Sequence, residues 1–212
     1  AIVSARLSLC AGGTMESLLF LKENKEAFSS LGTIFGLVLF GFAVFQYRRA
    51  EHWKKSEFAA KLYKDFSHDD ACQRAMWMLD WDGRRINFGS DSKPLVEICD
   101  YAILKPALRR HGDNEDDGCK QDDTKHDTGT RFTELEARIR DTFDVFLSHL
   151  SQFEWAIRNG LVRQDQVYPY LRYWIDMLKG RRQLPKDVAE QFFVYADAYG
   201  FEDVKRFFDR WP

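Results

Sequence analysis

Cysteine and proline are scarce in this chain of 212 residues, which has four of the former and five of the latter. The cysteines form no CxxC pair and follow no regular spacing: Cys10, Cys72, Cys99 and Cys119. A zinc motif or a disulfide framework would show such regularity. We therefore expect reduced thiols with mainly structural roles, in a reducing compartment.

An excess of charge of either sign is also missing, because the formal net charge is only −2. Acidic stretches separate basic pairs such as Arg109–Arg110 and Arg181–Arg182, so the sequence has no basic face for phosphates. Nucleic acid is not expected as a partner.

Motifs for catalysis are absent as well: the sequence has no GxSxG, Walker loop, HExxH or dinucleotide fingerprint. We predict no catalytic residue, no cofactor and no enzyme activity. One segment, from Asp80 to Arg85 (DWDGRR), places two carboxylates beside two guanidiniums and leaves a cryptic enzyme open. An ion-paired turn over aromatic surface is the more common origin of such a cluster.

Metal-binding patterns are incomplete. Four residues resemble the opening of a calcium loop: Asp113, Glu115, Asp117 and Gly118. The twelfth position of that loop is Thr124, where calcium needs a bidentate glutamate. Three zinc-type side chains are irregularly spaced: His111, Cys119 and His126. An exposed acidic loop over 111–130 accounts for both sets, and no metal site is predicted.

One long uncharged run is present, from Ala27 to Tyr47, between Glu26 and Arg48. Its 21 residues span roughly 31 Å as a helix, which matches the hydrocarbon core of a bilayer. A buried helix of a soluble protein is usually shorter, and a cleaved signal peptide begins earlier. The run predicts a transmembrane helix.

Four cations follow this run closely: Arg48, Arg49, Lys54 and Lys55. The lysines just before it are offset by glutamates, so the positive-inside rule puts the C-terminal part in the cytoplasm. Tyr47 and Trp53 are expected at the headgroup level, where the cations also hold anionic lipid.

Small residues recur within the run. Gly32 and Gly36 form a GxxxG pair, while Ser29, Gly36 and Ala43 lie at heptad spacing. Such a stripe lets two helices approach closely, so self-association into a homo-oligomer stays open.

Helical periodicity dominates residues 48–212. The clearest stripe has a 3-4-4-3-4-3-4 spacing: Phe132, Leu135, Ile139, Phe143, Phe146, Leu150, Phe153 and Ile157. Thr130 or Thr133 is expected to begin this helix, Thr133 with Glu136 as a capping box, and Gly160 to end it. No segment alternates convincingly at strand length, so an all-α fold is predicted.

Shorter helices are expected on both sides of this stripe. Downstream we predict three, over 165–180, 185–200 and about 204–211. Upstream, the spanning helix should continue to Phe66. A helix opened by Ser67 and Asp70 should then end at the Asp82–Gly83 turn, and another should run from residue 91 or 92 to Pro106.

The predicted organisation is a non-cytoplasmic tail over 1–26, a spanning helix over 27–47 and one cytoplasmic helical domain over 48–212. Residues 1–14 precede Met15 and are treated as an extension. Five aromatic residues on adjacent helices are the candidate partner surface, with core packing as the alternative: Trp155, Tyr168, Tyr170, Tyr173 and Trp174.

Three segments carry a resemblance: 53–66 (WKKSEFAAKLYKDF), 76–86 (MWMLDWDGRRI) and 143–174 (FDVFLSHLSQFEWAIRNGLVRQDQVYPYLRYW). Together they resemble bacterial single-pass membrane-anchored proteins of unknown function with a cytoplasmic all-helical domain. The resemblance implies that topology and a bacterial inner-membrane location, and it supplies no catalytic residues.

The sequence therefore favours a membrane-tethered helical module for protein interaction or sensing. Its expected partners are the lipid bilayer and an unidentified cytoplasmic protein. The alternative is an oligomerising membrane effector, as in toxin or phage-defence systems, which depends on the small-residue stripe.

Overall fold

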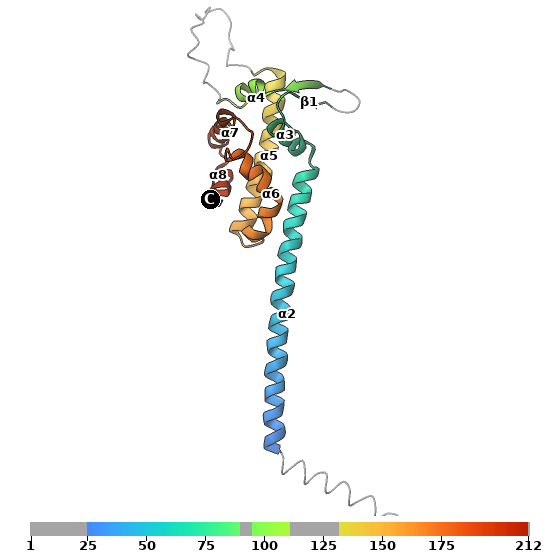
Figure 1. The fold of residues 1–212 in the computed structure, drawn as a ribbon. Coiled ribbons are helices and arrows are strands. Elements are labelled where there is room, and N and C mark those ends of the chain that lie inside the picture. The colour runs from blue at the N-terminus through green and yellow to red at the C-terminus, as the bar shows by residue number, and fades with distance from the viewer. Residues whose placement is uncertain (1–24, 90–94, 111–131, 212) are drawn as a thin grey trace, which may run out of the picture. The chain divides into compact units, whose positions relative to one another are not determined.

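The computed structural model describes residues 25–89, 95–110 and 132–211, with side chains from residue 32 onward (Figure 1). Within these ranges the chain forms seven helices and one two-stranded sheet, which confirms the predicted helical class. The residues of segment 111–130 that were compared with calcium and zinc patterns lie outside the described part. So do the first fourteen residues and the side chain of Ser29.

The chain divides into two compact units, residues 1–53 and 54–212. Helix α2, Lys25–His68, contributes to both. In the first unit its apolar side chains are exposed; among them, Phe40 is 69 % exposed and Leu37 is 66 % exposed. Among the described residues, no helix combines the length and apolarity that crossing a membrane requires.

The second unit is built around helix α5, Glu134–Arg158, which packs against α3, α4 and α8 (Figure 1). Its capping box forms as predicted, because Glu136 N–H donates to Thr133 Oγ1 (3.2 Å) and Thr133 N–H donates to Glu136 Oε2 (2.7 Å). Gly160 ends the helix with a φ of +68°. The other helices are α3 (Asp70–Asp80), α4 (Tyr101–Ala107), α6 (Gln164–Leu178), α7 (Lys186–Ala198) and α8 (Glu202–Asp209).

Phenylalanine rings fill the core of this unit. Phe66, on the last turns of α2, contacts the rings of Phe146 and Phe153 at centroid distances of 5.5 and 5.8 Å. Phe192 of α7 contacts both Phe143 and Phe146 at 6.2 Å. These tilted and edge-on pairs bury large apolar areas in the geometry that aromatic rings prefer.

The predicted helix from residue 91 or 92 to Pro106 is wrong in its first half. Strand β2, Val96–Cys99, pairs antiparallel with β1, Arg84–Asn87, and α4 begins only after Asp100. Asp100 caps α4 by accepting a 2.8 Å hydrogen bond from Ile103 N–H. Strands of four residues are too short to show alternation in the sequence, and their pairing is a tertiary contact.

Two predicted helix starts also shift. Helix α2 extends through Ser67 to His68, and Asp69 caps α3 by accepting from Cys72 N–H at 2.9 Å. Helix α6 begins after Arg163, whose N–H donates to the Gln166 side chain at 2.9 Å, so Asp165 lies in the first turn. Both cap positions lie two residues from those expected, a usual margin for helix ends.

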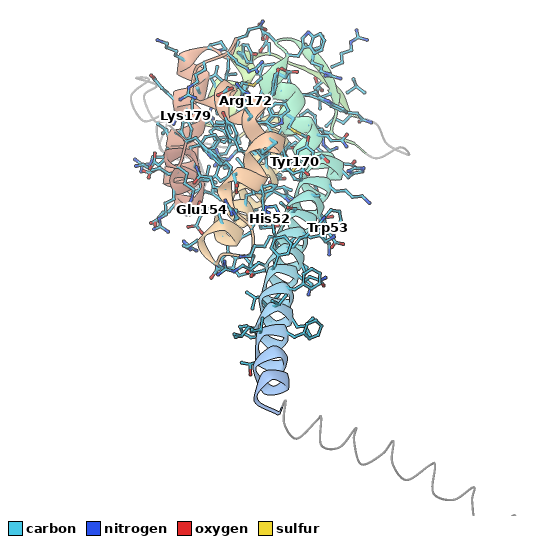
Figure 2. The ribbon with its side chains drawn as sticks, turned by 60° about the horizontal axis from the view of Figure 1, so that its bottom comes forward. His52, Trp53, Glu154, Tyr170, Arg172 and Lys179 are labelled. Carbon is cyan, nitrogen blue, oxygen red and sulfur yellow. The ribbon has the colours of Figure 1, made fainter. Side chains whose placement is uncertain are left out.

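A buried ion pair joins the central helix to the end of α8. Glu154, on α5 (Figure 2), is 1 % exposed. Its carboxylate accepts two hydrogen bonds from Arg210, with Nε to Oε2 at 2.5 Å and a terminal nitrogen to Oε1 at 2.6 Å. The bidentate geometry satisfies both oxygens, and the contact raises the pKa of Arg210.

We expect Arg210→Met to lower the free energy of unfolding by about 3 kcal/mol, because it leaves Glu154 buried without its counter-charge. Arg206→Met is the matched control: Arg206 pairs with Glu202 and Asp203 at the surface, and its loss should cost at most about 1 kcal/mol. Urea unfolding of both variants measures the difference. Equal losses of unfolding free energy in the two variants would contradict a larger contribution from the buried pair. Combining Glu154→Leu with Arg210→Met should recover most of the lost unfolding free energy, because no buried charge then remains unpaired.

Candidate functional site

The turn between α5 and α6 forms one wall of a pocket in the second unit. Gly160 takes a left-handed conformation there, and Leu161 N–H donates back to the Ala156 carbonyl at 3.0 Å. This closes the end of α5 and turns the chain within a few residues. The guanidinium of Arg163 then pairs with Asp165 through two hydrogen bonds of 2.9 Å.

The residues after α8 form the floor of this pocket. The Trp211 ring stacks on Tyr168 of α6, with the centroids 4.8 Å apart and the planes 26° apart. Lys179 Nζ donates to the backbone carbonyls of Phe208 and Trp211, and Gln164 Nε2 donates to the Arg210 carbonyl at 3.0 Å. The C-terminal segment is thereby held against both ends of α6.

The pocket, hereafter the Tyr168–Trp211 pocket, has a volume of about 890 Å³. Its lining combines an aromatic and aliphatic floor with three cations and one carboxylate. The lining residues are Lys55, Ile157, Gly160, Val162, Arg163, Gln164, Asp165, Tyr168, Arg181 and Trp211. The formal charge of this lining is +2, from three cations less Asp165.

Trp211 also has a polar group without a partner. The residue is 6 % exposed, and its Nε1 is buried without a hydrogen-bond acceptor among the described residues. Buried donors are normally paired, so an unpaired one beside a pocket is a specific feature of this site. An aromatic floor, an indole N–H and a cationic rim together favour a ligand with an acidic or carbonyl oxygen next to an apolar group.

A second hollow of about 720 Å³ lies among the end of α6, α7 and α8. Its lining balances three lysines against three carboxylates: Lys179, Lys186, Lys205, Glu190, Asp197 and Asp209. Because these charges cancel, this hollow has no preference for a ligand of one sign.

The five aromatic residues predicted as one partner surface are separated by their contacts. Tyr168 belongs to the pocket, whereas Tyr170 stacks on Tyr63 of α2 at 4.9 Å. Tyr173 and Trp174 contact each other edge-on, also at 4.9 Å. Trp155 is 51 % exposed on α5. Tyr170 stacks on Tyr63 yet stays 37 % exposed, while Tyr168 lines the pocket and Tyr173 lines a separate hollow of about 180 Å³ beside Asp80.

The predicted membrane-interface residues fall on α2. Tyr47 and Trp53 are exposed, as are Arg48, Arg49 and Lys54. Lys55 lines the Tyr168–Trp211 pocket. Sequence reasoning missed Arg163, Arg181 and Trp211, because residues so far apart in the chain show no common spacing.

The acidic cluster at the end of α3 has structural partners. Asp80 accepts a hydrogen bond from the Tyr173 hydroxyl, and Asp82 accepts one from Tyr101 N–H at 2.9 Å. Burial and Asp80 raise the pKa of Tyr173 to about 12, which opposes a role as a base. The Arg84 guanidinium lies over the Trp77 ring at 4.5 Å. Arg84 therefore packs on aromatic surface, as the turn alternative expected, while the two carboxylates bond to a hydroxyl and a backbone N–H in place of the expected ion pairs.

A search for similar proteins finds no matching family model, curated protein or solved structure.

Both described cysteines are buried, and both thiol pKa values are raised. Burial raises the pKa of Cys99 to about 11, with Glu97 and Asp100 adding to the effect. Burial and the neighbouring Asp69 raise the pKa of Cys72 still further. At neutral pH both are thiols rather than the reactive thiolates.

We expect Cys72 and Cys99 to react slowly with a thiol reagent at pH 8 while the chain is folded, and fast after unfolding in urea. The measurement uses a Cys10→Ser, Cys119→Ser background with a chelator present, so that only these two thiols report. Equal rates in the folded and unfolded chain would contradict their burial.

Proposed function

We propose that this chain is a membrane-tethered helical module whose C-terminal domain binds a partner protein in the cytoplasm. Two features support the proposal: the uncharged run of α2, and the Tyr168–Trp211 pocket. The aromatic floor and cationic rim of that pocket are the single observation that favours a binding role.

The membrane tether is supported by the apolar part of α2 and by the cations that follow it. The uncharged run begins at Ala27, although its side chains up to residue 31 lie outside those described. From Ile34 to Phe45 its large apolar side chains are between 38 % and 69 % exposed. Water disfavours such a surface, whereas a bilayer accepts it. The cations from Arg48 onward suit the cytoplasmic side, so the second unit is assigned there.

The binding role is supported by the charge and the aromatic surface of the Tyr168–Trp211 pocket. A positive lining attracts acidic groups, and the stacked rings of Tyr168 and Trp211 offer apolar area beside a free indole N–H. Aromatic and arginine side chains are the residues that most often dominate protein interfaces. An acidic segment that carries an aromatic or aliphatic side chain fits both properties.

The tether predicts that the chain stays with membranes after carbonate extraction. Val38→Arg combined with Phe40→Arg should move most of the chain into the soluble fraction, because each charge at the centre of a span costs about 2.5–3.5 kcal/mol. Lys61→Glu, an exposed change on the same helix, is the control and should leave the distribution unchanged. A wild-type chain found in the soluble fraction would overturn the tether.

The binding role predicts one stoichiometric cytoplasmic protein after cross-linking in native membranes, affinity purification and mass spectrometry. Lys55→Glu combined with Arg181→Glu should reduce its recovery by about tenfold or more, since reversing two rim charges repels an acidic segment. Lys61→Glu again serves as the control. Equal recovery with both variants would exclude the pocket as the contact.

The same experiment tests the alternative, an oligomerising membrane effector. A Cβ built on Gly32 or Gly36 meets no atom within 4 Å, so the small-residue stripe is open in the described chain. Ladders of the chain with itself, lost in a variant with Gly32→Ile and Gly36→Ile, would support this alternative instead.

A further inference from the structure

Three side chains with metal-binding atoms meet where α3 begins, beside the middle of α5. Asp69 precedes α3, Cys72 lies in its first turn, and His149 is on α5. One ligand atom from each lies within 4.8 Å of the other two. All three residues belong to the second unit and to helices or their caps.

Helix capping accounts for part of this cluster and leaves His149 without a role. One oxygen of Asp69 caps α3, and its carboxylate also accepts the Cys72 thiol proton. The His149 ring meets Phe66 edge-on, at 6.1 Å and 63°, which orients it. Neither of its ring nitrogens has a hydrogen-bond partner among the described residues, although the ring is half-buried.

A carboxylate oxygen, a thiol sulfur and an imidazole nitrogen are together the ligand atoms that zinc and similar divalent ions prefer. Zinc binds sulfur at about 2.3 Å, and nitrogen and oxygen at about 2.0–2.2 Å. Around a tetrahedral centre those ligand atoms lie roughly 3.5 Å apart, so the cluster needs side-chain movements of only about 1 Å. Calcium and magnesium prefer oxygen ligands alone, which excludes them here.

We propose that Asp69, Cys72 and His149 bind one zinc-type divalent ion and thereby link the start of α3 to α5. The Cys72 thiol releases its proton to solvent as the metal–sulfur bond forms, and no electron is transferred. Asp69 and His149 are partly exposed, so water completes the tetrahedron. The bound ion adds stability because the unfolded chain does not hold these ligands together.

Cobalt(II) is the probe, since its thiolate complexes absorb in the near ultraviolet and its tetrahedral complexes absorb strongly in the visible. The full chain in mild detergent, with Cys10→Ser and Cys119→Ser, is stripped by a chelator and titrated with cobalt. We expect both bands to saturate at one ion per chain and to disappear when zinc is added. An absence of both bands would overturn the proposal.

Variants identify the ligands. Cys72→Ser should abolish the charge-transfer band, and His149→Gln should weaken cobalt binding by about tenfold or more, while Cys99→Ser, the other buried thiol, should change neither. Because Cys72→Ser alters the core, its folding is checked by circular dichroism. Zinc should also raise the Tm of the parent chain and not that of His149→Gln, which is partly exposed. A band that persists in folded Cys72→Ser, or an equal Tm shift in both chains, would refute the site. Neither result depends on the partner or on the tether.

Discussion

Burial of the apolar stripe of α5 is the interaction on which the domain depends. Phe143, Phe146 and Phe153 are at most 1 % exposed, and helices from both sides of the sequence pack against them. Without this helix the shorter helices, α3, α4, α6, α7 and α8, lose the central apolar face around which they gather, and helices of their length are not stable alone. The buried Glu154–Arg210 pair is a polar contact on the same helix, and it fixes where the end of α8 lies.

This dependence explains how much of the fold was predictable. An apolar stripe, a capping box and a terminal glycine are local signals, so α5 was predicted with Thr133 as one of two starts, although Phe132 of the stripe lies before the helix. The hairpin was missed because it requires Arg84–Asn87 to find Val96–Cys99, and each strand is too short to be recognised alone. The cap positions near Ser67 and Asp165 shifted for a local reason, since several polar residues there compete to cap a helix.

The candidate site was harder to predict than the fold. Tyr168 and Lys55 were singled out, the first as an aromatic of a helix face and the second as a lipid-facing cation, and the structure places both in one pocket. Trp211 joins them by stacking on Tyr168, whereas Arg163 and Arg181 lie just before and just after α6. The cluster of Asp69, Cys72 and His149 was likewise invisible, because His149 is 77 residues beyond Cys72. Spacing in the sequence reports local geometry, and it does not show which residues from distant parts of the chain meet in the folded structure.

The last turns of α2 are buried in the second unit, and this burial constrains the length of the helix. Ala59 and Phe66 are both 0 % exposed, and seven residues, close to two full turns, separate them. One inserted residue between them would rotate Ala59 by about 100° relative to Phe66 and expose one of the two. An insertion of seven would restore the rotation but would move Ala59 about 10 Å along the helix axis, away from the side chains that cover it. The burial of both residues therefore fixes the length of this stretch of α2 as well as its helical phase.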